Sequence, residues 1–323
     1  MDYGLMTYNF THRFNIGDYI QSLAAKQFLP RTDHYINREE LHEYSGPATK
    51  IILNGFFMRH TKHWPPSRNI IPLFISFHMN IRRSEGMLKK SGVAYFKRYE
   101  PIGCRDLNTQ KMLEAKGIQA YFSNCLTLTL GKSYRHYANE DIFLVDILPK
   151  YPTRRSVFKS FNSFYKSIVH KDILLLGKRK KIIHKILGDK IIKEAKEITH
   201  VYSAEEFATE KSRFELAERT LKRYEKAKLV ITSRIHCALP CLAMGTPVIF
   251  LNGGFKPNQS CRFDGILDLF YTVNISRNGE LSANFDLDTV KNTAMLEPKT
   301  VHPKYLEMLT KKCEDFIRNE HIK

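Results

Sequence analysis

The stretch 229–251 constrains the fold more than any other part of the chain. Its first four residues, Leu229 to Thr232, are apolar and include two β-branched side chains before the threonine, which predicts a buried strand. The polar turn Ser233-Arg234-Ile235-His236 then leads into an apolar segment of helical length, and Pro247 to Leu251 predicts a second buried strand. Ligands bind at the carboxyl ends of the strands in parallel sheets of this kind. We therefore expect Arg234 and His236 at a ligand site.

Patterns for strands and helices alternate along the rest of the chain. This alternation predicts an α/β fold with parallel sheets. The expected strands are 3–8, 50–53, 70–77, 101–104, 120–123, 142–147, 197–202, 229–232 and 247–251, and the expected helices are 18–28, 92–99, 106–115, 212–226, 262–270 and 303–317. For 323 residues we expect two domains, 1–135 and 136–302, that face a cleft, and a C-terminal helix within 303–323 that packs back on the body.

The chain is strongly basic, with 51 Lys and Arg against 33 Asp and Glu and a formal net charge of +18. Such a charge favours an anionic partner: nucleic acid, an acidic membrane surface or a phosphorylated substrate. We expect no nucleic acid, since no recognised binding motif accompanies the charge. The chain starts without a signal-peptide pattern, and no apolar run approaches the ~20 residues of a membrane span. We expect a cytoplasmic protein whose six cysteines are reduced and lie in the core.

Residues 150–193 form a basic segment that contains 13 Lys and Arg but only two acidic residues. Apolar side chains recur in it at helical spacing: Phe158, Phe161, Tyr165 and Ile168. Two interpretations remain open. The segment is either a solvated excursion whose aromatic residues pack on the domain, or a basic helix that lies on an anionic membrane surface.

Two further junctions between a strand and a helix carry polar side chains. In Asn15-Ile16-Gly17-Asp18, Gly17 lets the backbone approach a ligand closely, whereas Asn15 and Asp18 can equally serve only to cap the helix. In Gly103-Cys104-Arg105-Asp106, Asp106 suits the cap of the next helix and leaves Arg105 at the strand end. There its planar guanidinium can bind a carboxylate or phosphate, or pair with an acid at the surface.

His236 is the residue best suited to proton transfer. Positive neighbours and a helix N-terminus lower the pKa of a histidine, and a bound dianion raises it again; alternatively, His236 caps the helix. Arg262 either adds charge to the same cleft or is solvated, and His78 lies at the cleft edge or is structural. Trp64-Pro65-Pro66 predicts a rigid loop on which a sugar could stack.

Asn15-x-Gly17-Asp18, Arg105-Asp106 and Ser233-Arg234-x-His236 together resemble, in order and spacing, the polysaccharide pyruvyl transferase family. The resemblance covers about residues 3–271. It implies a fold similar to the GT-B glycosyltransferases, with two Rossmann-like domains facing a cleft. Among the residues, it implies that Arg105 binds phosphoenolpyruvate and that His236 is catalytic, while Arg262 stands where relatives often have a lysine. Relatives commonly have a run of glycines where this chain keeps only Gly55, which predicts an acceptor side of different shape.

From these observations we expect a pyruvyltransferase that moves the pyruvyl group of phosphoenolpyruvate onto a sugar as a ketal. The acceptor is a polysaccharide or a lipid-linked glycan precursor, and a lipid-linked acceptor would place the protein peripherally on the inner membrane face. Neither a metal nor a cofactor is expected. The alternatives are a GT-B-type glycosyltransferase that uses a nucleotide sugar, and a non-enzymatic protein that binds polyanions or membranes. The expected catalytic residues are His236 and Arg105, and the expected substrate-binding residues are Arg105, Arg234, Arg262, Ser233, Asn15, Gly17, Asp18 and His78.

Overall fold

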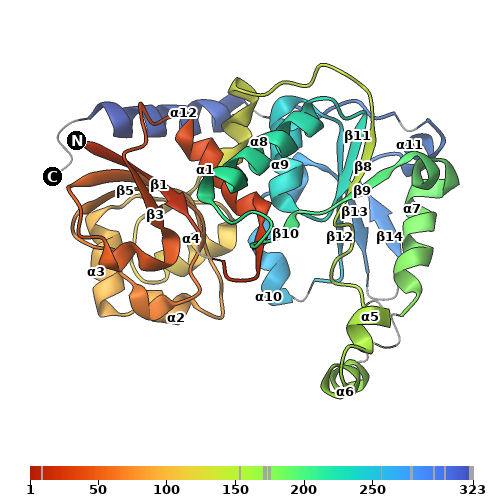
Figure 1. Ribbon diagram of the computed structural model, residues 1–323, viewed down its shortest axis with the longest axis horizontal. Helices are drawn as coiled ribbons and strands as arrows, with labels where there is room; N and C mark the ends of the chain where they lie inside the picture. Colours follow the sequence, from red (N-terminus) through yellow and green to blue (C-terminus); the bar gives the residue numbers. More distant parts are fainter. Residues whose placement is uncertain are drawn as a thin grey trace.

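Two six-stranded sheets with helices around them organise the computed structural model, so the predicted α/β fold with parallel sheets is confirmed (Figure 1). The structure describes residues 1–8, 10–152, 154–169, 173, 176–255, 257–276, 279–293, 295–301 and 303–319. Parts of the basic segment (153, 170–172, 174 and 175) and the end of the predicted C-terminal helix region (320–323) lie outside these residues.

The first sheet is parallel throughout and has the strand order β3-β1-β4-β5-β6-β7. Its strands are β1 (Asp2–Thr7), β3 (His34–Asn37), β4 (Thr49–Phe57), β5 (Ile70–Met79), β6 (Ile102–Cys104) and β7 (Ala120–Phe122). The sequence predicted five of these six strands; β3 has too few apolar residues for the pattern to show. β5 extends beyond the predicted end at residue 77, so His78 lies inside a strand rather than after it.

The second sheet has the order β14-β13-β12-β11-β8-β9, and only its edge strand β14 is antiparallel. Its strands are β8 (Ile142–Val145), β9 (Lys196–Ile198), β11 (Leu229–Thr232), β12 (Val248–Gly253), β13 (Tyr271–Ile275) and β14 (Leu281–Ala283). When the strands of each sheet are numbered along the chain, both sheets read 2-1-3-4-5-6. Each sheet therefore has a switch point, at β1/β4 and at β8/β11, outside which ligands bind in such sheets.

Helices cover both sheets. Around the first sheet lie α1 (Ile16–Lys26), α2 (Ser84–Met87), α3 (Lys90–Arg98) and α4 (Leu107–Glu114), with the short 3-10 helices η1 (Arg38–Glu43), η2 (Thr61–His63) and η3 (Leu126–Lys132). The second half adds α5 (Arg154–Val157), α6 (Phe161–Val169), α7 (Lys178–Glu194), α8 (Glu210–Glu225), α9 (Ile235–Met244), α10 (Pro257–Ser260), α11 (Leu287–Thr293) and α12 (Pro303–Arg318), with the 3-10 turns η5 (Cys261–Phe263) and η6 (Leu267–Leu269). Among the described helices, none is long and apolar enough to cross a bilayer.

A small antiparallel sheet of β2 (Arg13–Asn15) and β10 (Val201–Ser203) connects the two halves. The prediction of one strand over 197–202 is therefore wrong, because β9 ends at Ile198 in the second six-stranded sheet and β10 belongs to this separate two-stranded sheet. The carboxylate of Asp146 holds the intervening turn: it accepts hydrogen bonds from Thr199 Oγ1 (2.8 Å) and from the backbone of His200 (3.0 Å). The His200 carbonyl in turn accepts from the amide of Ile16, 2.8 Å away, at the start of α1.

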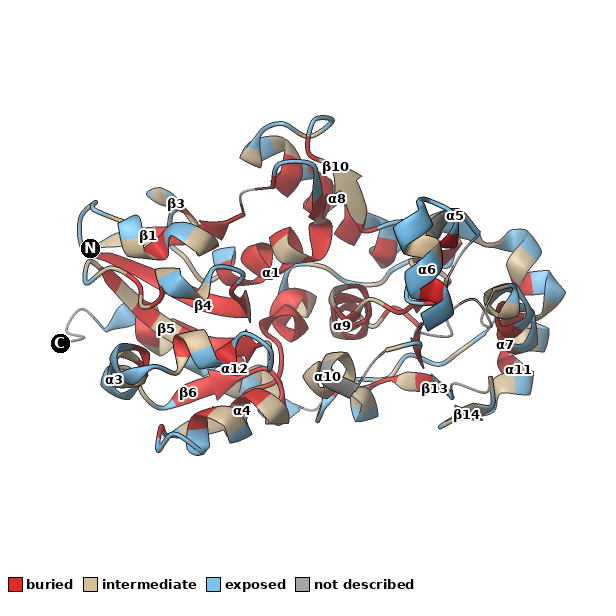
Figure 2. Cartoon of the chain, turned by 90° about the horizontal axis from the view of Figure 1, so that it is seen from below, coloured by how far each residue is buried: buried red, intermediate tan, exposed pale blue. Residues whose placement is uncertain are grey.

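The apolar core runs through both halves, and buried residues concentrate on the sheets and on α1 and α9, which pack against each other (Figure 2). The C-terminal helix α12 returns to the first half (Figure 1) and buries Leu309, Cys313 and Phe316. Lys50, buried in β4, donates hydrogen bonds to three carbonyls at the end of α12, those of Phe316, Ile317 and Asn319. These bonds satisfy the carbonyls that a helix C-terminus leaves open.

Three local predictions need correction. Residues 262–270 form two 3-10 turns rather than one helix, because Gly265 between them adopts φ +83°, which a helix cannot contain. Trp64 is buried against Phe96 at 5.1 Å between ring centroids, so it is part of the core rather than a surface on which a sugar stacks. The six cysteines are free as predicted, but Cys261 is half-buried and lines a cavity.

Candidate active site

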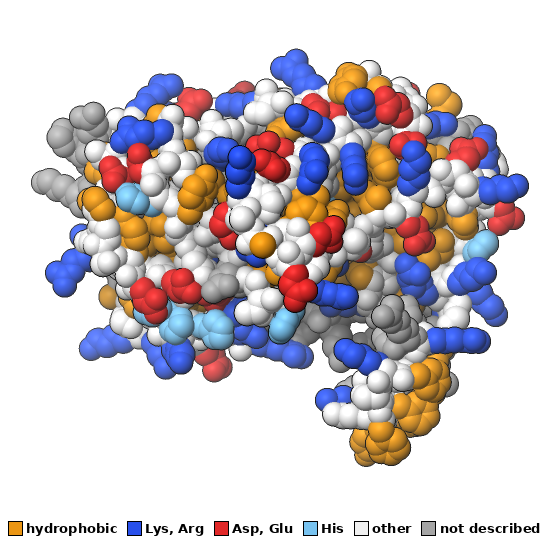
Figure 3. Space-filling model, in the orientation of Figure 1, with side chains coloured by type: hydrophobic (Ala, Val, Ile, Leu, Met, Phe, Trp, Pro, Cys, Tyr) orange, Lys and Arg blue, Asp and Glu red, His pale blue; other side chains and the backbone are white. Residues whose placement is uncertain are grey.

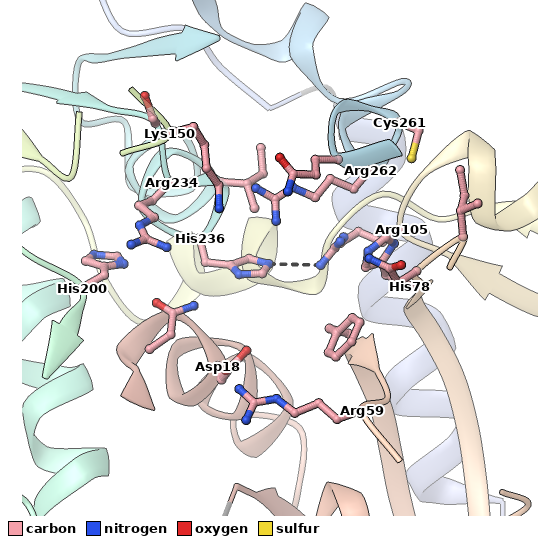
Figure 4. Close-up of a pocket in the computed structure, with 17 residues that line it drawn as sticks. Asp18, Arg59, His78, Arg105, Lys150, His200, Arg234, His236, Cys261 and Arg262 are labelled. Carbon is pink, nitrogen blue, oxygen red and sulfur yellow. Dashed lines mark hydrogen bonds between the residues drawn. The ribbon is translucent and has the colours of Figure 1, made fainter. Parts of the chain in front are cut away.

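A cavity of about 360 Å³ opens where the carboxyl ends of the two sheets meet (Figure 4). The first half lines it with residues that follow or end β2, β4, β5 and β6, and the second half with residues that follow β8, β9, β11 and β12. The lining residues are Asn15, Asp18, Phe56, Arg59, His78, Asn80, Ile81, Arg105, Lys150, His200, Ser233, Arg234, Ile235, His236, Gln259, Cys261 and Arg262. The structure thus gathers every site residue expected from the sequence except Gly17.

Arg105 reaches the cavity from the end of β6 and is itself 3% exposed. Its backbone amide donates to the carbonyl of Phe77 in the neighbouring strand β5 (2.9 Å), which fixes where the side chain starts. Asp106, the next residue, caps α4 as predicted by accepting a hydrogen bond from the backbone of Thr109 (2.9 Å). The cap turns the chain into the helix and leaves the Arg105 guanidinium facing the cavity (Figure 4).

Asp106 also binds the imidazole of His78, whose Nδ1 lies 2.7 Å from Oδ2 of Asp106. Burial, with repulsion from Arg105, lowers the pKa of His78 to about 4. Burial of Asp106 opposes its ionisation, but His78 and Arg105 outweigh this and hold the pKa of Asp106 below its ordinary value. His78 is therefore neutral at neutral pH and donates Nδ1–H to the carboxylate, so its Nε2 is left as a hydrogen-bond acceptor.

The turn between β11 and α9 supplies Arg234 and His236. Arg234 occupies the N-cap position of α9, so the alternative that His236 caps this helix is wrong. Arg234 makes no side-chain cap and instead donates Nε–H to Asp146 at 2.9 Å. The N-cap residue therefore leaves the amides at the start of α9 without a side-chain cap of its own, and this helix N-terminus, which attracts anions, lines the cavity with Ile235 and His236.

The hydroxyl of Ser233 is occupied within the protein. It donates to the carbonyl of Leu251 (2.7 Å) and accepts from the amide of Leu148 (3.0 Å). These bonds link the end of β11 to β12 on one side and to the loop after β8 on the other. Ser233 lines the cavity, but these two bonds give it a structural task, which the sequence pattern did not indicate.

His236 is half-buried and points across the cavity toward Arg105, whose Nη1 lies 3.4 Å from its Nε2 (Figure 4). Burial, together with Arg105 and Arg262, lowers the pKa of His236 well below its ordinary value. Gly17 is not among the described residues that line the cavity. It lies behind His236, and a Cβ at Gly17 would be 3.0 Å from His236 Cβ. The expected contact of Gly17 with a ligand is therefore replaced by a role in making room for the imidazole, while Asn15 caps α1.

The cavity holds more positive charge than its carboxylates compensate. Arg262 lies with its guanidinium 4.7 Å from the ring centroid of Phe263, and burial with repulsion from Arg105 and Arg234 lowers its pKa to about 10. The Nε atoms of Arg105 and Arg262 are both buried without a hydrogen-bond partner among the described residues. A buried donor without a hydrogen bond costs free energy in the empty protein, and Nε of Arg105 has a long ion pair with Oδ2 of Asp106, at 3.9 Å. Together the two arginines define a site prepared for an anion.

Arg59, Lys150 and His200 also line the cavity, although sequence reasoning did not select them. Lys150 follows the predicted strand 142–147, so the rule that identified Arg105 would have found it. His200 carries no such signal because the turn that presents it depends on the β2–β10 pairing. Asp18 is an acidic member of the wall, and burial raises its pKa although nearby arginines, Arg38 first, oppose the shift.

The charge crowding predicts that Arg262→Met stabilises the empty protein while it weakens anion binding. Removing the cation relieves the cost of burying its charge and its repulsion with Arg105. From the size of the Arg262 pKa shift, we expect the free energy of unfolding to rise by on the order of 1–3 kcal/mol. Thermal unfolding without ligand measures this as a higher Tm. A lower Tm in the variant, with the fold retained, would show that Arg262 is held by compensating contacts and would contradict the description of the site.

Comparison with known proteins agrees with the motifs. The family model of polysaccharide pyruvyl transferase matches residues 15–254, so the chain belongs to this family. No curated protein matches the chain. Among solved structures, a functionally uncharacterised protein from Klebsiella pneumoniae subsp. pneumoniae NTUH-K2044 is similar, with 12% sequence identity over 82% of this chain and 88% of that chain and a TM-score of 0.46.

Proposed function

We propose that this protein transfers the pyruvyl group of phosphoenolpyruvate to two hydroxyls of one sugar, which forms a cyclic ketal and releases phosphate. The observation that carries the proposal is that the side chains of Arg105 and Arg262 line one cavity with His236, whose Nε2 lies 3.4 Å from Nη1 of Arg105. Phosphoenolpyruvate offers two anionic groups, a carboxylate and a phosphate, on a small skeleton. Two guanidinium groups suit such a donor because each can bind a planar or tetrahedral oxyanion with two parallel hydrogen bonds.

In this proposal Arg105 and Arg262 hold the donor, and the open amides at the start of α9 add to the attraction. Arg234 is oriented by Asp146, and Lys150 completes the positive wall. As the phosphate leaves, charge gathers on its oxygens, and fixed cations already in place stabilise that charge without reorganisation.

His236 is the proposed general acid. Its imidazole is neutral in the empty cavity, and the negative donor raises its pKa so that it carries a proton when substrate is bound. The protonated ring delivers this proton to C3 of the donor, which becomes a methyl group, and C2 acquires cationic character. The first sugar hydroxyl attacks C2, and the bond from C2 to the phosphate oxygen then breaks.

His78 is the proposed base for the acceptor. Asp106 fixes its tautomer, so Nε2 can take the proton that the first hydroxyl loses when its oxygen bonds to C2. The second hydroxyl attacks the same carbon after phosphate has left, and its proton leaves with the phosphate. One proton is thus gained at C3 and two are lost from the sugar, so the products are the ketal and hydrogen phosphate.

The acceptor in this proposal is a sugar of a polysaccharide or of a lipid-linked glycan precursor.

We further propose that the two sheets with their shared strand order are two Rossmann-like domains, 1–135 and 136–302, in a GT-B-like arrangement with the acceptor on the side of the first sheet. Gly55 there has φ +94°, and a Cβ would lie 2.5 Å from Gln21 Oε1. This glycine is thus required by the bend in β4 itself.

A thermal-shift comparison tests the donor directly. We expect phosphoenolpyruvate to raise the Tm and nucleotide sugars to leave it unchanged, with inorganic phosphate giving a smaller rise because it lacks the carboxylate. Stabilisation by a nucleotide sugar alone would instead support a glycosyltransferase. If neither donor stabilises the protein, while polyanions such as heparin do, the chain is a polyanion-binding protein and the proposed reaction is wrong.

Donor binding should take up protons from solution. The pKa values of His236 and His78 lie below the ordinary value in the empty cavity, and bound negative charge raises them. When a group has a higher pKa in the complex than in the free protein, the protein binds the donor more tightly as the pH falls. This gain occurs between the pKa of the complex and the lower pKa of the free protein. Calorimetry of phosphoenolpyruvate binding at neutral pH, in buffers of different ionisation enthalpy, measures the uptake. His236→Gln should reduce it, and equal uptake by the variant would contradict the assignment.

A further inference from the structure

The basic segment divides into two parts with different environments. In α7 the apolar residues face inward, where Ile182, Ile183, Ile186, Leu187 and Ile191 are buried. The α5–α6 arm, defined here as residues 154–169, instead projects from the body (Figure 1). The expectation that the aromatic residues of this segment pack on the domain therefore fails for the arm, whose apolar side chains form a cluster at its end (Figure 3).

The arm turns most of its apolar residues toward solvent, although Val157 is buried. Half of the large hydrophobic side chains that are exposed in the described residues belong to it: Phe158 (60% exposed), Phe161 (85%), Tyr165 (60%), Ile168 (48%) and Val169 (57%). The buried residue of α6 is the polar Ser167. A helix that packs on its own domain shows the opposite arrangement, with apolar residues inward. A contiguous exposed apolar patch of this kind marks an interaction surface.

Positive charge surrounds this patch. Arg154, Lys159 and Lys166 are exposed on the arm, and the arm contains no acidic residue. The adjoining helix α7 presents further exposed cations along its outer side: Lys180, Lys181, Lys185, Lys190 and Lys193. The basic segment 150–193 has little negative charge to balance these cations, since Asp172 and Asp189 are its only acidic residues.

We propose that the α5–α6 arm inserts its aromatic end into the surface of an anionic lipid bilayer, with the surrounding lysines on the headgroups. Apolar side chains ringed by cations match the two layers of such a surface, acyl chains below and negative headgroups above. A nucleic acid would meet the cations but leave the aliphatic Ile168 and Val169 exposed. A second copy of the chain would bring two arms of like charge together.

The arm follows the cavity wall in the sequence. Lys150 lines the cavity, and the arm begins four residues further along the chain. In Figure 1 the arm projects on the same side of the molecule as α10, whose residue Gln259 lines the cavity as well. A bilayer bound by the arm would therefore face the side of the molecule on which α10 lies. This placement does not depend on the reaction in the cavity.

Co-sedimentation of the full chain with vesicles tests this inference without donor or acceptor, so its outcome is independent of the proposed reaction. We expect binding to phosphatidylcholine vesicles that contain phosphatidylglycerol, and weak binding to phosphatidylcholine alone. Phe161→Ser/Tyr165→Ser should weaken binding to the anionic vesicles at least about tenfold. This variant leaves the stacked pair Phe158–Phe164 intact, so the arm keeps its internal contact. Lys159→Gln/Lys166→Gln should weaken binding by roughly fivefold per lysine and reduce its salt dependence, while Arg154 and the α7 lysines retain the rest.

Tyr35→Ser/Tyr137→Ser is the matched control, since it removes two exposed aromatic residues outside the arm (58% and 65% exposed) and should bind as the wild type does. A Phe161→Trp variant adds a direct readout, because Trp64, the one native tryptophan, is buried and its emission stays constant. Its emission should shift to the blue with anionic vesicles only. Unchanged binding of Phe161→Ser/Tyr165→Ser, no binding by the wild type, or a dimer that this variant dissociates would each overturn the inference.

Discussion

His236→Gln should abolish most of the turnover while leaving donor binding almost intact. Glutamine keeps the polar contact with Arg105 but cannot deliver a proton to C3, and a positioned general acid contributes about 10²–10⁴-fold to the rate. We therefore expect kcat to fall by about 10³-fold, with the Kd for phosphoenolpyruvate changed by no more than a few-fold. Single-turnover release of phosphate, together with calorimetry of donor binding, measures both quantities.

The matched control is His200→Gln, because His200 is another imidazole at the same cavity and its Nε2 lies 2.6 Å from the hydroxyl of Tyr224. Since that ring has a partner within the protein, its replacement should reduce kcat far less than the change at His236. If the His236 variant kept near-normal turnover, or if both variants lost the same amount, His236 would not be the acid.

Arg105→Gln should chiefly weaken donor binding. Its guanidinium is 3% exposed, so its contact with an anion forms in a site shielded from water. Hydrogen bonds to charged groups contribute about 1.5–3 kcal/mol, which corresponds to roughly 10–150-fold in Kd. Calorimetric titration with phosphoenolpyruvate measures the loss.

Two companion variants define what Arg105 supplies. Arg105→Lys keeps the charge but lacks the planar fork, so it should recover only part of the lost affinity. Arg31→Gln removes an arginine whose side chain is 56% exposed and paired with Asp33, and it should leave donor binding unchanged. Wild-type affinity in Arg105→Gln would show that the anion binds elsewhere in the cavity.

The elements that could be predicted from sequence are those whose signal is local. β11 occupies the predicted residues 229–232, and the junctions after β6 and β11 present Arg105, Arg234 and His236 to one cavity. This follows because the carboxyl ends of parallel strands meet at one edge of the sheet. A polar residue directly after a buried strand therefore lies at the edge where ligands bind. The family resemblance added the pairing of Arg105 with His236, which no local pattern contains.

Features that depend on distant contacts could not be predicted. The turn that exposes His200 exists because Asp146, more than fifty residues earlier, binds it and because β10 pairs with β2. The helix expected at 262–270 fails at Gly265, where Phe122 and Leu107 from the other half approach closely. The bond between His78 and Asp106 likewise spans separate elements, so an isolated histidine in a strand gave no sign of its partner.

A small donor with a carboxylate and a phosphate should bind between Arg105 and Arg262 with its methylene carbon at His236. A crystal structure of the protein with phosphoenolpyruvate at saturating concentration tests this most directly. We expect the carboxylate and phosphate on the two guanidinium groups and C3 within contact of the imidazole. A donor bound elsewhere, or bound with C3 turned away from His236, would contradict it.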